Sequence, residues 1–341
     1  MTLVFTLCSN NYLAHAITLG DSLLKHNPEY IFKIGLVDKK NSQIDYTSIP
    51  FEIIEVESIG ISAFDEMFKR YTITELNTAV KPFYFQYFFK EDPNVNKIIF
   101  LDPDILVYRS FTELEEVLEE NEIVITPHIT TPLDDDKFQA ENDFLNAGLY
   151  NLGFIALKRG HESQKLIEWW AARLETKAYV DFARGLFTDQ LWINFAPLFF
   201  EKVHIFCHPG YNMAYWNLHE RLLADTNKVV KNNIPYPLVF FHFSGYNPLK
   251  PDILSKYQDR FSFEDRKDII ELFKSYSQKL FVNGYNTYIK CLSFYEIKKQ
   301  KFDLDNYITY KKTIPFHKRI MRGIVLRIIK IFKVNTAYYT N

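Results

Sequence analysis

The sequence predicts an α/β protein, in which a mixed, mostly parallel sheet is flanked by helices and followed by a helical C-terminal extension. Short apolar runs typical of buried strands alternate with longer segments whose apolar residues recur at helical spacing. From residue 262 onward the pattern is helical and charged, without a further strand. With 341 residues, 47% of them hydrophobic, the chain can bury the core of one large domain or of two smaller ones.

The elements follow in order along the chain. A short apolar strand at residues 2–7 leads through a polar turn into a helix that begins at Leu13 and ends before Asn27-Pro28. Further strands are predicted at residues 32–37, 51–56, 98–101, 123–127 and 150–157. Helices are predicted within residues 64–89 and over residues 162–174. In a parallel sheet of this kind, ligands bind beyond the carboxyl ends of the strands.

Composition narrows the functional class and the compartment. The formal net charge of −2 argues against a nucleic-acid-binding protein that relies on overall positive charge. Cys8, Cys207 and Cys291 lie far apart without a C-x-x-C motif, which favours a reducing compartment. The first residues lack a basic segment typical of a signal peptide, and no stretch is long enough to span a membrane. We therefore expect a cytoplasmic protein.

The stretch IIFLDPDILVY places Asp102 and Asp104 directly after a predicted strand. Two carboxylates this close repel each other unless a positive group lies between them. Such a pair can hold a hard divalent ion, Mg²⁺ or Mn²⁺, together with phosphate oxygens. Asp-Pro-Asp is also ordinary turn chemistry, so the motif alone leaves a purely structural alternative.

A second candidate motif, HFSGYNPLKP, follows an apolar run near residue 240. His242 is either a packed core histidine or a metal ligand, and imidazole beside two carboxylates suits Mn²⁺ better than Ca²⁺. Gly245 allows the backbone to approach a ligand closely, and Lys250 suits a phosphate group.

Three functional hypotheses remain open at this level. A phosphatase of the haloacid-dehalogenase type would use Asp102 as nucleophile, but its aspartate pair normally follows the first strand of the domain. A nucleotide-sugar transferase places the pair after about 100 residues of nucleotide-binding sheet, so the position of Asp102 favours the transferase. A catalytically silent module that binds a glycan or a nucleotide is the third.

Motifs in a fixed order along the chain favour the transferase. They are FTLCSNNYLAHAITLGDSLLKH, the lysine at 81, the Asp-Pro-Asp motif, YNLGFIAL, FTDQLWIN and HFSGYNPLKP. In these motifs the chain resembles glycosyltransferase family 8, the group of glycogenin and the lipopolysaccharide galactosyltransferases. The resemblance extends from the first strand to about Pro251.

The resemblance implies a GT-A fold, with a single Rossmann-like sheet, and a site of three parts. The metal ligands would be Asp102, Asp104 and His242. The nucleotide and its phosphates would be bound by Leu7, Tyr12, Lys81, Gly245 and Lys250. The sugar would be contacted by Asn151 and Gly153 and by the candidate catalytic residues Asp189 and Gln190. Asp189 has two alternative roles, as the nucleophile of a double displacement or as a ligand of a sugar hydroxyl.

The activity that the resemblance implies is transfer of a hexose from a UDP-sugar, with Mn²⁺ or Mg²⁺ as cofactor and with retention at the anomeric carbon. The acceptor would be a glycan or a lipid-linked molecule in the assembly of a surface polysaccharide or glycolipid. We expect a catalytic domain over residues 1–255 and a helical extension over residues 256–341.

The segment over residues 314–334 carries six Lys or Arg residues and no acidic residue. On a helical wheel most of its basic residues fall on one side and most of its apolar residues on the other. This pattern is typical of a helix lying on an anionic membrane surface. The alternative is a helix that packs on the body of the protein or on a second copy.

Overall fold

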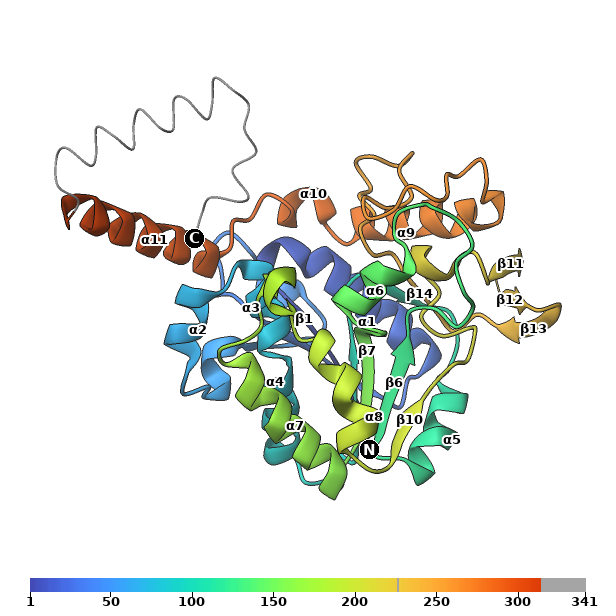
Figure 1. Cartoon of the computed structure of the whole chain (residues 1–341), viewed down its shortest axis with the longest axis horizontal. Helices are drawn as coiled ribbons and strands as arrows, with labels where there is room; N and C mark the ends of the chain where they lie inside the picture. Colours follow the sequence, from blue (N-terminus) through green and yellow to red (C-terminus); the bar gives the residue numbers. More distant parts are fainter. Residues whose placement is uncertain (226, 314–341) are drawn as a thin grey trace. The chain divides into compact units, whose positions relative to one another are not determined.

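The computed structural model describes residues 1–225 and 227–313, and its centre is a seven-stranded sheet (Figure 1). The strand order is β10 (Val203–Ile205), β6 (Ile123–Pro127), β7 (Tyr150–Lys158), β4 (Lys97–Leu101), β1 (Thr2–Cys8), β2 (Ile31–Leu36) and β3 (Glu52–Glu55). All neighbouring pairs are parallel except those of β7 with β4 and with β6. The predicted mixed, mostly parallel sheet is therefore confirmed.

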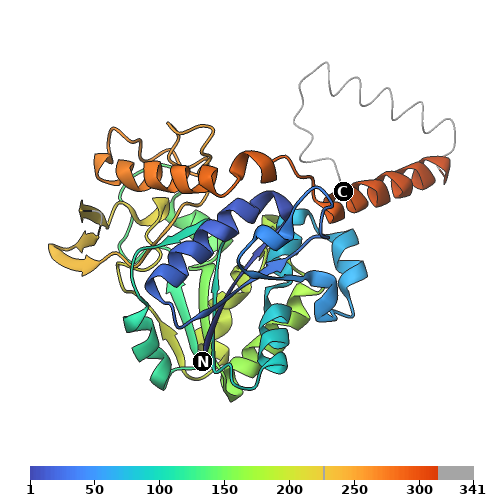
Figure 2. The same cartoon turned by 180° about the vertical axis from the view of Figure 1, so that it is seen from behind.

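Helices cover both faces of this sheet. Helices α4 (Lys81–Glu91) and α7 (His161–Leu174) lie side by side in front of it in Figure 1. Helix α1 (Leu13–His26) lies on the opposite face, as the view from behind in Figure 2 shows. The helix-rich segment expected before residue 89 consists of α2 (Phe64–Arg70), α3 (Ile73–Ala79) and α4.

The strands divide their side chains between these two layers because successive residues of a strand point to opposite faces. In β1, Phe5 belongs to the core beneath α4, whereas Val4 belongs to the core beneath α1. The Phe5 ring centroid is 4.9 Å from that of Phe85 and 5.2 Å from that of Phe100. Burying such aromatic side chains is the main stabilising contribution to the sheet–helix layers.

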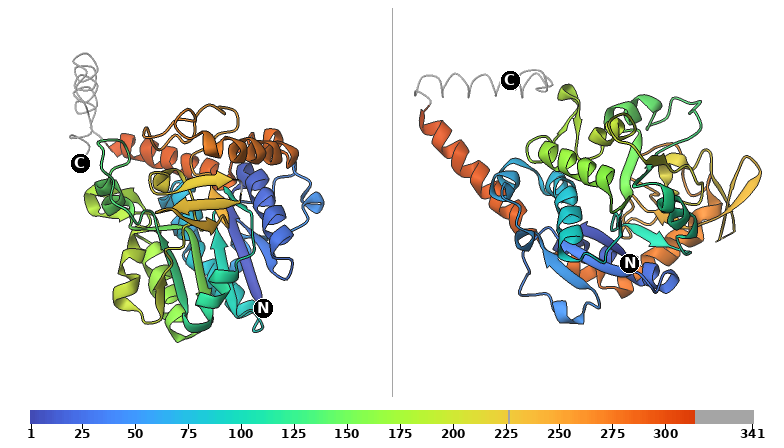
Figure 3. Two further views of the ribbon diagram at one scale, coloured as in Figure 1. Left: turned by 90° about the vertical axis from the view of Figure 1, so that its right-hand side faces the viewer. Right: turned by 90° about the horizontal axis from the view of Figure 1, so that it is seen from below.

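Several short strands were not predicted from the sequence. Strands β11 (Leu222–Asp225), β12 (Lys228–Lys231) and β13 (Ile234–Pro237) form a separate antiparallel sheet, drawn in yellow and orange in Figure 3. Strand β5 (Ile105–Val107) pairs antiparallel with β14 (Phe240–His242). Strands of three or four residues are too short for an apolar periodicity to be recognised. The β5–β14 pair matters most because it joins segments that are far apart in the sequence.

The described helices continue past the last strand, as expected. Helices α9 (Ile270–Val282) and α10 (Tyr285–Tyr288) pack against α1 within a first compact unit, Met1–Glu296. This unit extends beyond residue 255, so a functional division there stays a prediction. Most of α11 (Phe294–Thr313) belongs to a second unit that begins at Ile297. The predicted amphipathic segment 314–334 lies outside the described residues, and among those described no helix is long and apolar enough to cross a membrane.

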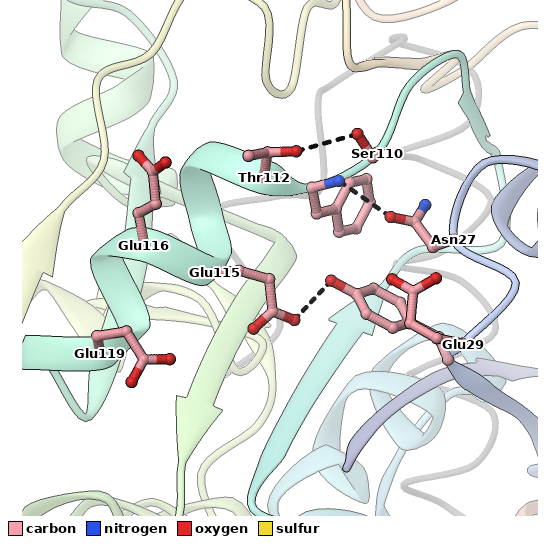
Figure 4. Close-up of a pocket in the computed structure, with 9 residues that line it drawn as sticks. Asn27, Glu29, Ser110, Thr112, Glu115, Glu116 and Glu119 are labelled. Carbon is pink, nitrogen blue, oxygen red and sulfur yellow. Dashed lines mark hydrogen bonds between the residues drawn. The ribbon is translucent and has the colours of Figure 1, made fainter.

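An ion-pair cluster joins the amino ends of β1, β2 and β4 to α5 (Thr112–Glu120). Glu115 accepts hydrogen bonds from Tyr30 at 2.5 Å and Thr2 at 3.0 Å, and Lys97 Nζ lies 2.6 Å from its carboxylate. The cluster borders a concavity of about 360 Å³ shown in Figure 4. Burial alone would raise the pKa of Glu115, but the bonds from Lys97, Tyr30 and Thr2 lower it.

Glu115→Gln should therefore destabilise the fold at neutral pH. We expect a loss of about 1–3 kcal/mol in the free energy of unfolding, measured by urea denaturation. Because the folded-state pKa of Glu115 lies below its unfolded value, the loss should be complete above about pH 4.3 and shrink as pH falls further. Exposed Glu116→Gln on the same helix is the control, and an equal loss in both variants would contradict the assignment.

Candidate active site

Asp102 and Asp104 lie at the carboxyl end of β4, in the turn that leads into β5. The turn is closed by the hydrogen bond from Ile105 N–H to Asp102 O, at 3.2 Å. Both side chains are partly exposed, 35% for Asp102 and 21% for Asp104. They are therefore accessible from solvent at the edge where a mostly parallel sheet binds its ligands.

His242 is brought to the aspartates by the β5–β14 pair. It lies opposite Ile105 in the register, and the next N–H, that of Phe243, donates to Asp104 O at 2.8 Å. His242 Nε2 is 3.0 Å from Asp104 Oδ1 and 3.7 Å from Asp102 Oδ2. One candidate ligand atom from each of the three residues lies within 4.8 Å of the others, so the described residues contain a group that could hold a metal ion.

The electrostatics of this group favour a cation. Burial raises the pKa of Asp102 to about 6, although the charges of Lys81 and His242 oppose this. Burial would also raise the pKa of Asp104, but the charge and hydrogen bond of His242 lower it below its ordinary value. The two aspartates in turn raise the pKa of His242 against the opposing effect of burial. A proton or a metal ion is thus favoured between the imidazole and the carboxylates.

The antiparallel strand β7 begins beside this edge, and its residue Gly153 lies against Asp102 and His242. Its carbonyl accepts from Asp102 N–H at 2.8 Å. A Cβ atom at Gly153 would lie 2.4 Å from His242 Cε1 and 2.8 Å from Asp102 Oδ2. Since real Cβ atoms do not approach this closely, the site requires glycine here.

A buried ion pair lies beneath the metal group. Lys81 Nζ is 2.6 Å from Asp189 Oδ2 and donates to Leu152 O at 2.7 Å. The lysine and aspartate side chains are 3% and 2% exposed. The indole N–H of Trp170 donates to Asp189 O at 3.0 Å. Lys81 is therefore engaged inside the protein, and a direct contact of its ammonium with the nucleotide stays a prediction.

The other two residues expected at the sugar share a hydrogen bond network. Gln190 Oε1 accepts from Leu152 N–H at 3.1 Å, and Gln190 Nε2 donates to Ala147 O at 2.9 Å. Asn151 Nδ2 lies 3.5 Å from Gln190 Oε1, and Gly153 N–H donates to Asn151 Oδ1 at 3.2 Å. The structure thus brings Asn151, Gly153 and Gln190 together, and Gly153 is hydrogen-bonded to Asp102.

The residues expected at the nucleoside differ in their accessibility. Tyr12 is 39% exposed and its ring stacks on that of His15, with centroids 4.4 Å apart. Burial of its hydroxyl and the nearby carboxylate of Asp104 raise the pKa of Tyr12. The side chain of Leu7 packs in the core beneath α4, so a role of Leu7 in nucleotide binding stays a prediction and would fall to its backbone.

The loop after β14 carries the residues expected at the diphosphate. Gly245 has φ +74°, a left-handed conformation that favours glycine, and a Cβ there would also approach Ser255 Oγ to 2.5 Å. Lys250 is exposed in the same loop. Its side chain is accessible to a ligand, and its phosphate contact stays a prediction.

Sequence reasoning missed two polar residues at the site, His128 and Asn212. Asn212 Oδ1 is 3.2 Å from His242 Nδ1, and His128 Nε2 is 3.2 Å from Asn151 Nδ2. Asn212 belongs to the segment HPGYNMAYWNLHER, which is largely buried in the structure. A polar residue within an aromatic run was the available signal, but its partners are distant in sequence.

Comparison with known proteins finds a family model and relatives that match large parts of the chain. The family model described as glycosyl transferase family 8 matches residues 3–251. The uncharacterized protein YfnF of Bacillus subtilis (strain 168) is 26% identical over 172 residues, which are 49% of this chain and 55% of YfnF. The match thus spans about half the length of YfnF. YfnD of the same organism is 22% identical over 249 residues, 71% of this chain and 76% of YfnD.

Among solved structures, the galactosyltransferase LgtC, crystallised with donor and acceptor sugar analogues, superposes with a TM-score of 0.45 at 18% identity. The superposition covers 82% of this chain and 95% of LgtC.

The buried ion pair yields a testable prediction. Lys81→Met should destabilise the fold by about 3–5 kcal/mol, because it leaves the Asp189 carboxylate buried without its counter-charge. Urea denaturation would measure the loss, with Lys90→Met, an exposed position on the same helix, as control. A loss in Lys81→Met no larger than in the control would show that the pair does not stabilise the fold.

Proposed function

The chain belongs to glycosyltransferase family 8, and from that premise we propose that it transfers a hexose from UDP-hexose to a glycan or lipid-linked acceptor, with a divalent metal ion as cofactor. The observation that carries this proposal is the approach of Asp102, Asp104 and His242 at the carboxyl end of β4. Nothing observed favours the phosphatase or the silent module.

The donor set fits Mn²⁺ or Mg²⁺. Carboxylate oxygens are the ligands that both ions prefer, and the added imidazole nitrogen favours Mn²⁺. When bound, the ion supplies positive charge that stabilises the leaving diphosphate. Asp102, Asp104 and His242 would hold it, and the exposed carboxylate edges leave room for phosphate oxygens.

The remaining residues would each bind a different part of the donor: the base, the diphosphate or the hexose. The exposed ring of Tyr12, supported from below by His15, provides a stacking surface for the uracil base. Lys250 and the backbone at Gly245 would bind the diphosphate. Asn151, Gly153, Asp189 and Gln190 would border the hexose, because they lie on the β7 side of the metal group.

The burial of Asp189 argues against a role as the nucleophile, which its residue type alone would allow. Its carboxylate is 2% exposed and is paired with Lys81 at 2.6 Å. A nucleophile must reach the anomeric carbon, so this burial favours Asp189 as a residue that orders the sugar end of the site. The proposed outcome is nevertheless retention at the anomeric carbon.

The acceptor side is proposed from the sequence. A lipid-linked or glycan acceptor in surface polysaccharide or glycolipid assembly would accord with a cytoplasmic enzyme that binds an anionic membrane surface through residues 314–334. Those residues lie outside the described part of the chain.

Calorimetric titration of UDP tests the metal site directly. The wild-type protein should bind UDP with Mn²⁺ present and lose most of this affinity in a chelator. Asp104→Asn should weaken binding by at least about tenfold, because a neutral amide replaces a charged metal ligand. Exposed Asp225→Asn is the control and should bind as the wild type does. UDP binding that needs neither metal nor Asp104 would refute the proposed metal site.

Stereochemistry provides an independent test. The protein is incubated with Mn²⁺ and a panel of α-linked UDP-hexoses, and proton NMR identifies the anomer that is released. Slow hydrolysis of the true donor should release the hexose first as its α anomer. Release of the β anomer would refute retention. Phosphate release from simple phosphoesters without any UDP-sugar hydrolysis would instead favour the phosphatase.

A further inference from the structure

We propose that Asn212 is a positioning residue that presents the Nε2 lone pair of His242 to the metal ion, an inference that rests on the proposed function. The Asn212 side chain is 0% exposed and lies between His242 and Asn151. Its Oδ1 is 3.2 Å from His242 Nδ1, and its Nδ2 is 3.1 Å from Asn151 Oδ1.

The backbone of β7 sets the direction of these hydrogen bonds. A backbone N–H can only donate. Gly153 N–H therefore requires the acceptor Oδ1 of Asn151 to face it, at 3.2 Å. Leu152 N–H requires Gln190 Oε1 in the same way, at 3.1 Å. Asn151 Nδ2 then faces Gln190 Oε1 and His128 Nε2, as a donor should.

The orientation of the Asn151 amide determines which atoms donate in the next two hydrogen bonds, from Asn212 to Asn151 and from His242 to Asn212. Because Asn151 Oδ1 can only accept, the atom of Asn212 that faces it is the donor Nδ2. The acceptor Oδ1 of Asn212 is left to face His242, which must donate from Nδ1. A neutral imidazole that carries its proton on Nδ1 has its lone pair on Nε2.

Nε2 faces the two carboxylates, 3.0 Å from Asp104 Oδ1. The reverse direction would place an N–H of His242 against Asp104 and leave no nitrogen ligand. The network thus fixes Nδ1 as the donor, so that Nε2 is the ring atom left to bind an ion in place of a proton. The hydrogen bond to the other ring nitrogen is what normally fixes the orientation of a metal-ligating histidine.

The backbone holds Asn212 in place relative to His242. Residue 212 has φ +54°, a left-handed conformation that asparagine tolerates better than most residues. Its carbonyl accepts from Asn217 Nδ2 at 2.9 Å. Its neighbour Met213 accepts from His242 N–H at 2.8 Å. Asn212 and His242 are therefore joined through the backbone as well as through their side chains.

The experiment compares Mn²⁺ affinity, in the presence of UDP, of the wild type and Asn212→Gly. Glycine removes the side chain without straining the left-handed backbone. We expect a 10–100-fold loss of Mn²⁺ affinity, as for other partners of metal-ligating histidines. Pulsed electron paramagnetic resonance of bound Mn²⁺ should show ¹⁴N coupling from an imidazole in the wild type and a weakened coupling in Asn212→Gly. Asn212→Asp keeps an acceptor for Nδ1 and should keep the coupling.

Asn27→Ala is the matched control. Asn27 is 1% exposed and accepts from Phe111 N–H at 3.0 Å, at the opposite end of the sheet (Figure 4). This variant should lose stability and keep its Mn²⁺ affinity and ¹⁴N coupling.

If Asn212→Gly keeps the Mn²⁺ affinity and the ¹⁴N coupling of the wild type, the inference about Asn212 is overturned and the proposed function is not. If Asn212→Gly does not fold, by circular dichroism, Asn212→Asp decides: folded protein without the coupling would overturn the inference. A wild type that binds no Mn²⁺ with UDP would overturn the proposed function, and the inference with it.

Discussion

The site depends on one constraint: two carboxylates are held at the end of a buried strand, and their repulsion must be balanced. Burial raises the pKa of Asp102, and Asp104 is stabilised as a charged group mainly through His242. The chain provides hydrogen bonds and an imidazole there, while the ammonium of Lys81 is paired with Asp189. A pair of this kind, open to solvent on one side, is a favourable place for a divalent cation and the phosphates it carries.

The reversed direction of β7 explains why the polar residues around this pair come from such distant segments. Since β7 runs against β4, its first residues lie beside the last residues of β4. Asn151 and Gly153 thereby reach Asp102, and the backbone N–H groups of β7 orient Asn151 and Gln190. Asp102, after β4, and His242, on β14, both occupy the space that a Cβ of Gly153 would fill. The close packing of β4, β7 and β14 at this point therefore depends on glycine at residue 153.

The buried Lys81–Asp189 pair connects the site to the helical layer. Lys81 begins α4, and its ammonium lies over Phe100 in the core, 4.1 Å from the ring centroid. Removing either charge alone is costly in such a place. Lys81 also binds the backbone of β7 at Leu152 O, so residue type alone does not distinguish a ligand from its support.

By itself, the sequence determined the α/β class, the main strands and helices, and the metal candidates. These features are local: apolar periodicity reports which face of an element is buried, and Asp102-Pro-Asp104 is visible as a motif. Only the tertiary structure decided the direction of β7, the short β5–β14 pair, the burial of Lys81 and Leu7, and the place of Asn212. These depend on contacts between segments up to about 140 residues apart, such as Ile105 opposite His242, and on hydrogen bonds of fixed direction. Periodicity carries no information about either, because it records the environment of each residue without naming its partner.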